Sequence, residues 1–209
     1  MKTNSIIKLI FLNLFASLII LSPLWVSAQK KSKKIAPEPG TFTSLEDAMK
    51  ADPTKVFKLD LTKKKLKVFP QEIFTFKNLM QLNLSKNKLT ELPANLGDLN
   101  KLNYLDISKN KITQLPESVG NLRLLNSFKM SANKIQSLPS SFFRLPSLEI
   151  IDFYSNPLIF EPQQFSKLSK KLKYLDVRNT GIGNEECKQL QQLLPNVVIK
   201  FNKSCNCSN

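Results

Sequence analysis

A 23-residue repeat constrains this chain more than any other feature of its sequence. Three consecutive segments align without a gap, at 79–101, 102–124 and 125–147. Each has apolar residues at positions 1, 4, 6, 11, 14, 18 and 21, Asn at position 9 and Pro at position 15. Less regular copies occupy 56–78 and 148–171, and a last one begins at Leu172. Self-similarity at a fixed period indicates stacked units that share one continuous core.

The first half of each repeat predicts a short β-strand. Side chains alternate across a strand, so positions 4 and 6 point inward while positions 3, 5 and 7 point outward. The inward residues of the central repeats are Leu82 and Leu84, Leu105 and Ile107, Phe128 and Met130, and Ile151 and Phe153. The Pro-containing second half is long enough for the return crossover that parallel strands need, so we expect a parallel sheet.

The motif LxxLxLxxNxL, followed by LPxx and further apolar residues, resembles the 23-residue class of the leucine-rich repeat family. The resemblance covers residues 56–200 and implies an α/β fold. The fold that the resemblance implies is a short curved solenoid of about six repeats, with helical caps and a parallel sheet on the concave face.

The family's asparagine ladder maps onto position 9, at Asn87, Asn110, Asn133 and Asn156. We expect these amides to bond backbone groups of their own repeat and of the next one. Lys64 and Thr180 replace Asn at the two ends, where we expect the ladder to fray.

Residues 1–28 read as a signal peptide. They contain Lys2 and Lys8 but no acid, then an apolar stretch from Leu9, and end in Val26-Ser27-Ala28. This order of basic, apolar and small residues is typical of secretory signals, and it predicts cleavage after Ala28. The alternative is an uncleaved membrane anchor. After cleavage we expect no stable membrane span and a secreted, periplasmic or cell-surface location.

The remaining boundaries follow from composition and from the ends of the repeat. Residues 29–43 are basic and contain Pro and Gly, which predicts a flexible linker. Residues 44–55 predict an N-terminal cap helix, with Ser44 at the N-cap and Leu45, Ala48 and Met49 on one side. The repeats occupy 56–184. Residues 185–209 predict a C-terminal cap with a helix (185–194), a strand (197–201) and a cysteine-containing tail.

Export changes the interpretation of the cysteines. In an oxidising compartment Cys187 can pair with Cys205 or Cys207, which would tie the tail to the cap. The alternative is that all three remain free thiols.

Composition argues against catalysis. The chain has no His, which removes imidazole bases and ligands, and its three Cys cannot complete a four-thiolate zinc site. We therefore predict no enzyme activity, no metal and no cofactor. The formal charge of +15 suggests nucleic acid, but the sequence has no recognition helix and no interleaving of aromatic and basic residues. Nucleic acid is therefore not a predicted partner.

The resemblance implies that partners bind the concave face. Tyr and Arg most often anchor protein interfaces, and they gather in the last repeats. The predicted partner-binding residues are Tyr104, Lys129, Ile150, Asp152, Tyr154, Tyr174, Asp176 and Arg178. The alternative is that these residues simply suit a strand. Our leading hypothesis is an exported, non-enzymatic module that binds a protein.

Lysines at positions 8 and 10 predict a basic ridge at one edge of the sheet. The members of this lysine ridge are Lys63, Lys65, Lys86, Lys88, Lys109, Lys111 and Lys134. Repeats stack about 5 Å apart, and two such charges repel by about 0.8 kcal/mol in water. The ridge could bind an anionic envelope glycan or lipid, or serve solubility alone. A purely structural surface component is a third alternative.

Overall fold

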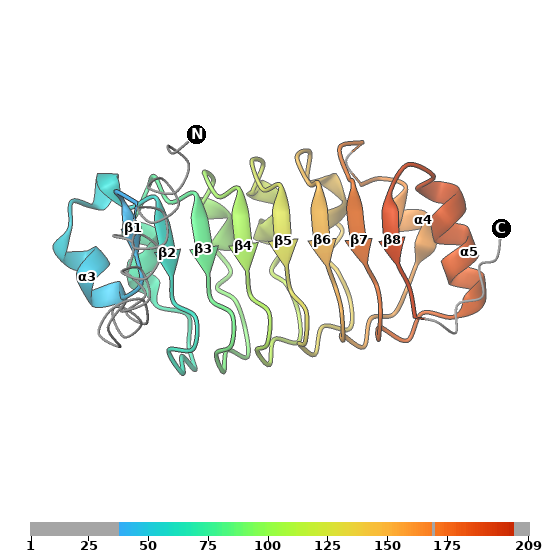
Figure 1. Ribbon diagram of the computed structural model, residues 1–209, viewed down its shortest axis with the longest axis horizontal. Coiled ribbons are helices and arrows are strands. Elements are labelled where there is room, and N and C mark those ends of the chain that lie inside the picture. The colour runs from blue at the N-terminus through green and yellow to red at the C-terminus, as the bar shows by residue number, and fades with distance from the viewer. Residues whose placement is uncertain (1–37, 169, 203–209) are drawn as a thin grey trace, which may run out of the picture. The chain divides into compact units, whose positions relative to one another are not determined.

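The computed structural model describes residues 38–168 and 170–202. The predicted signal peptide and most of the predicted linker lie outside these residues, as do Cys205 and Cys207. The strands of the described part form a single parallel sheet and follow one another in sequence order (Figure 1). The strands are β1 (Thr41–Phe42), β2 (Lys58–Asp60), β3 (Gln81–Asn83), β4 (Tyr104–Asp106), β5 (Ser127–Lys129), β6 (Ile150–Asp152), β7 (Tyr174–Asp176) and β8 (Val198–Lys200).

Helical turns carry the chain back from one strand to the next. Five are 3-10 helices: η1 (Pro53–Lys55), η2 (Gln71–Thr75), η3 (Leu96–Asp98), η4 (Glu117–Asn121) and η5 (Phe142–Arg144). The α-helices are α3 (Leu45–Lys50), α4 (Pro162–Phe165) and α5 (Asn184–Leu193). Helix α4 replaces a 3-10 turn in repeat 148–171, which is one residue longer than the others.

The repeat period sets the sheet register. Gln81 pairs with Tyr104, and Tyr104 pairs with Ser127. Across the longer repeat the offset grows by one, so Ile150 pairs with Tyr174. The strands remain aligned because the return side absorbs the extra residue. The parallel solenoid predicted from the sequence is confirmed.

The core lies between the sheet and the return side. All the inward residues predicted for the central strands are fully buried, including Leu82, Phe128 and Phe153. In the later repeats phenylalanines fill this space, and the rings of Phe142 and Phe153 lie 5.8 Å apart. Burying large apolar side chains in every repeat supplies the main stabilisation of such a stack.

The N-terminal end departs from the prediction in two places. Thr41–Phe42, inside the predicted flexible linker 29–43, forms β1 and pairs with β2, because Phe42 packs against the core. The linker boundary at residue 43 is therefore wrong for these residues. Ser44 Oγ accepts a hydrogen bond from Asp47 N at the start of α3, and Ala48 is buried. Met49, expected on the same side, is 46% exposed.

The position-9 asparagines join each repeat to the one before it. Asn110 Nδ2 donates to Ile107 O in its own repeat and to Leu84 O in the preceding repeat, at 2.8 and 3.0 Å. Its Oδ1 accepts from Leu89 N, also in the preceding repeat. Our expectation that the amides reach the next repeat is therefore wrong. The side chain points toward the preceding repeat because the end of each strand lies beside the turn of that repeat.

At the C-terminal end of the ladder, Thr180 keeps part of this role. Its Oγ1 donates to Val177 O at 2.6 Å, and the residue is 1% exposed. A threonine side chain is too short to reach the preceding repeat as well. Among the described residues, Phe153 O therefore receives only the side-chain bond from Asn156.

Candidate functional site

The solvent-facing side of the sheet, called here the sheet face, is formed by positions 3, 5 and 7 of each repeat. Position 5 has a structural role that the sequence did not reveal. Its Asp or Asn Oδ1 accepts a hydrogen bond from the backbone N–H of position 7, as in Asp152 to Tyr154 and Asp176 to Arg178. The same bond forms from Asp60, Asn83 and Asp106. These side chains therefore terminate the strands, which is a common use of Asp and Asn.

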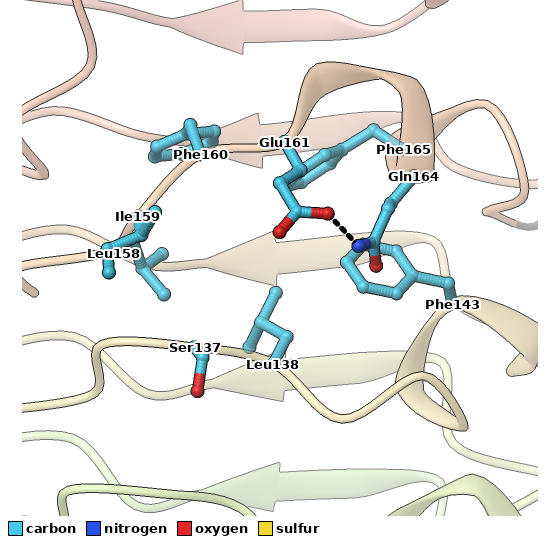
Figure 2. A pocket seen from close by; sticks show the side chains of 9 residues that line it. All are labelled: Ser137, Leu138, Phe143, Leu158, Ile159, Phe160, Glu161, Gln164 and Phe165. Carbon is cyan, nitrogen blue, oxygen red and sulfur yellow. Dashed lines mark hydrogen bonds between the residues drawn. The ribbon is translucent and has the colours of Figure 1, made fainter.

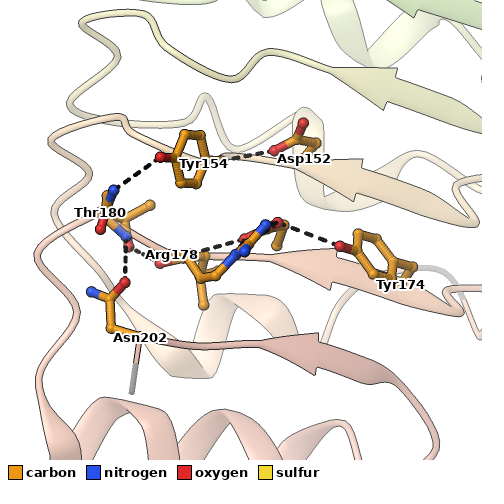
Figure 3. A network of polar contacts seen from close by, with 9 residues as sticks. Asp152, Tyr154, Tyr174, Arg178, Thr180 and Asn202 are labelled. Carbon is orange, nitrogen blue, oxygen red and sulfur yellow. Dashed lines mark hydrogen bonds and ion pairs between the residues drawn. The ribbon is translucent and has the colours of Figure 1, made fainter. Parts of the chain in front are cut away.

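A cluster on β6 and β7 joins several of the predicted partner-binding residues (Figure 3). Arg178 donates to both carboxylate oxygens of Asp176, with Nη2 to Oδ2 at 2.6 Å and Nε to Oδ1 at 3.0 Å. Its guanidinium also lies 5.3 Å from the centre of the Tyr154 ring. The cluster therefore holds one arginine in a fixed position against an aromatic ring.

Further contacts hold the two tyrosines of this cluster. Asn179 Nδ2 donates to the Tyr154 hydroxyl at 3.2 Å, and Tyr174 donates to Asp176 Oδ2 at 3.4 Å. Asp176 is 3% exposed, whereas the Arg178 side chain is 47% exposed. The anchoring carboxylate is thus buried while the arginine and Tyr154 face solvent. Ordering long side chains in advance lowers the entropy cost of binding.

An exposed apolar column lies beside the cluster. Ile150, Tyr174 and Val198 occupy position 3 of β6, β7 and β8, and the sheet register places them side by side. Ile150 is 38% exposed and Val198 is 58% exposed. Val198 was not among the predicted site residues. The continuation of the position-3 column into the C-terminal strand was the signal that could have identified it.

Tyr104 and Lys129 lie apart from this cluster, on β4 and β5. Lys129 Nζ is 5.5 Å from the centre of the Tyr104 ring. Partial burial and the nearby Asp106 raise the pKa of Tyr104 to about 12, so its hydroxyl stays protonated. Burial, together with Asp176 and Asp106, raises the pKa of Asp152 above its usual range.

The lysine ridge has an unusual backbone. Lys63, Lys86 and Lys109, at position 8, have φ of 60°, 59° and 57°, a left-handed conformation that L-residues with a Cβ disfavour. The backbone N–H of position 8 donates a hydrogen bond to a carbonyl of the next repeat, as from Lys86 N to Ser108 O. The backbone N–H of position 10 donates to a carbonyl of the preceding repeat, as from Lys111 N to Leu89 O. The backbone therefore aligns two columns of lysines, and all the ridge lysines are exposed.

A polar pocket opens on the sheet face over β1 to β4, and Tyr104 is the one residue of its lining that was among the predicted partner-binding residues. It has a volume of about 280 Å³. Its polar lining residues are Thr41, Lys58, Asp60, Gln81, Asn83 and Tyr104. Only the outward alternation of position 3 and position 5 residues hinted at this group, and the contribution of β1 was hidden inside the predicted linker.

A second pocket lies on the return side, between repeats 125–147 and 148–171 (Figure 2). Its volume is about 130 Å³, and Leu138, Phe143, Ile159, Phe160 and Phe165 line most of it. Position 14, apolar and buried at Phe69, Leu92 and Leu115, is Glu161 here and is exposed. Glu161 accepts a hydrogen bond from Gln164 instead of filling the core. The pocket therefore exists because one core side chain is replaced.

The described residues contain no group of acidic, Cys or His side chains arranged to hold a metal ion. None of their helices has both the length and the apolar character required to cross a membrane. Cys187 is buried on α5 and is disulfide-bonded. The only other cysteines of the chain, Cys205 and Cys207, lie outside the described residues.

Known proteins share this repeat and this fold. A family model described as a leucine-rich repeat region matches residues 94–204, and another, described as a leucine rich repeat, matches residues 54–112. A leucine-rich repeat protein of Leptospira interrogans is similar at 30% identity and a TM-score of 0.59, over 71% of this chain and 43% of that one.

An internalin of Listeria monocytogenes shares the fold at 22% identity and a TM-score of 0.58, over 81% of this chain and 57% of that one. The chain thus spans less than two thirds of either protein, and no curated protein matches it. Because one family model covers more than half of the sequence and the strands repeat in register, the chain belongs to the leucine-rich repeat family.

Proposed function

We propose that the chain is an exported, non-enzymatic module that binds a protein through the β6–β8 part of its sheet face. Leucine-rich repeat proteins are in general non-enzymatic binding modules. The observation that carries the proposal is the exposed Tyr154–Arg178 pair, held by the buried Asp176 beside the Ile150–Tyr174–Val198 column. Aromatic and arginine anchors next to apolar surface are typical of the energetic centre of a protein interface.

Two features support export. Residues 1–28 have the composition of a signal peptide, and Cys187 is disulfide-bonded, as is common in proteins of oxidising compartments.

Cross-linking and capture from the native cells tests the binding proposal. The tagged protein and a Tyr154→Ala/Arg178→Ala variant are compared, and proteins captured by the tagged protein are identified by mass spectrometry. We expect the variant to capture at least tenfold less of one partner that the tagged protein captures reproducibly. Truncating an anchor residue commonly costs 2 kcal/mol or more of binding free energy, which is about thirtyfold in affinity.

Two further variants make this result interpretable. Leu124→Ala removes an apolar side chain that is 55% exposed at the end of its repeat, away from the cluster, and serves as the matched control. Arg178→Lys keeps the charge but loses the paired bonds to Asp176 and the stacking on Tyr154. Equal capture by the native protein and the double variant would remove the support for this site.

The lysine ridge favours a second candidate function, binding of an anionic envelope glycan or lipid. Two aligned columns of exposed lysines form no ion pair among the described residues. The test is sedimentation with vesicles containing phosphatidylglycerol, and with a phosphorylated polysaccharide, at low and high salt. Binding that falls steeply with salt and is lost on charge reversal of Lys86 and Lys109 supports the ridge. Binding that ignores both changes contradicts it.

A further inference from the structure

The polar pocket over β1 to β4 combines unused hydrogen-bonding groups from adjacent strands. The Gln81 side chain makes no hydrogen bond to any other described residue. Asn83 Oδ1 accepts a hydrogen bond from Ser85 N, which leaves both Nδ2 protons of Asn83 available to a ligand. Asp60 Oδ1 accepts a hydrogen bond from Thr62 N, which leaves Asp60 Oδ2 available. The pocket therefore offers an amide, two further donors and a carboxylate oxygen.

The sheet fixes how these groups are spaced. Gln81 pairs with both Lys58 and Tyr104, and Asp60 pairs with Asn83. Neighbouring strands lie about 4.8 Å apart, and successive outward residues of one strand lie about 6.6 Å apart. Alternate equatorial hydroxyls of a hexopyranose ring are separated by nearly the strand spacing. Planar side chains on neighbouring strands can therefore bond two hydroxyls of one ring.

The charges favour a neutral ligand. Lys58 is paired with Glu38 at 2.5 Å, which leaves Asp60 as the charged lining group without an ion partner among the described residues. The carboxylate of Asp60 repels an anion at close range. The +15 charge of the whole chain repels a cation at longer range. A neutral ligand with several hydroxyl groups avoids both penalties.

We propose that this pocket binds one hexose unit of a neutral glycan, with Gln81, Asn83 and Asp60 bonding its hydroxyl groups. The site is separate from the Tyr154–Arg178 cluster and does not depend on the protein partner proposed for it. It also differs from the lysine ridge, for which the candidate ligand is a negatively charged glycan or lipid.

Nuclear magnetic resonance of the side-chain amides tests the proposal directly. The purified protein is titrated with maltotriose, cellotriose and chitotriose, up to tens of millimolar. We expect at least one trisaccharide to shift the Gln81 and Asn83 amide signals saturably, in the millimolar range usual for few hydrogen bonds in an open site. If none of the three sugars shifts these signals, the proposal is overturned.

Variants distinguish a sugar from other occupants. Gln81→Ala removes a side chain without an internal hydrogen bond and is expected to weaken sugar binding about fivefold, whereas Gln136→Ala, on an exposed return segment, should have no effect. Asp60→Asn retains an oxygen for Thr62 N and should change sugar affinity less than Gln81→Ala. Nα-acetyl-lysine amide is titrated as well. If it alone shifts the signals, and Asp60→Asn abolishes that shift, the pocket takes a basic side chain of a protein and the glycan proposal is wrong.

Discussion

Asn156→Ala should destabilise the protein more than Asn110→Ala, although Asn110 lies nearer the middle of the stack. When Asn110 is removed, Leu84 O keeps its bond from Asn87 and Ile107 O keeps its bond from Asn133. Leu89 N alone loses its partner. One stranded buried group costs about 1–3 kcal/mol.

No asparagine follows Asn156 in the ladder, because Thr180 occupies position 9 of the next repeat. Removal of Asn156 leaves Ile135 N and Phe153 O without a partner among the described residues, and only Met130 O keeps a bond, from Asn133. We therefore expect Asn156→Ala to cost about 1 kcal/mol more than Asn110→Ala.

Urea unfolding followed by circular dichroism measures both free energies of unfolding, and equal m-values show that the same transition is compared. A double-mutant cycle identifies the cause. In a Thr180→Asn background the new amide can donate to Phe153 O, so the extra cost of Asn156→Ala should disappear. An Asn110→Ala variant at least as destabilised as Asn156→Ala would refute this reasoning.

Three further predictions concern single positions. Thr180→Asn alone should raise the free energy of unfolding by about 0.5–1.5 kcal/mol, the value of one added hydrogen bond, as measured by urea unfolding. Lys109→Asn should stabilise the protein by about 0.5 kcal/mol in the same assay, because Asn tolerates the left-handed backbone better. Lys111→Asn removes the same charge at a residue whose φ is not positive and should give no such gain. Asp152→Asn should stabilise the protein at about pH 7 but not at about pH 3, since the raised pKa of Asp152 means that folding disfavours its charged form, and this penalty is absent below the unfolded pKa. A gain for Asp152→Asn that is equal at both pH values would show that charge is not the cause.

The repeat made much of the fold predictable because the same pattern of apolar residues, Asn and Pro recurs in successive units. Strand alternation identified the buried pairs, such as Leu105 and Ile107, without any knowledge of long-range contacts. The direction of the asparagine bonds was not predictable, because it depends on how far each strand end lies from the preceding turn. The strand at Thr41 was also missed, since two residues are too few for a periodic pattern and only pairing with β2 orders them.

For the candidate sites, the sequence by itself determined which residue types face outward, and it therefore identified Tyr154, Tyr174 and Arg178. Tertiary structure alone decided that Arg178 is held by a buried Asp176 and lies against Tyr154, because side-chain partners on neighbouring strands depend on register and burial. It also decided where pockets form. One arises where Glu161 leaves a core position empty, and the other where β1 to β4 gather polar groups that lie far apart in sequence. The periodic pattern determines which strands and core residues each repeat has, whereas the stacking of the repeats determines which side chains contact one another.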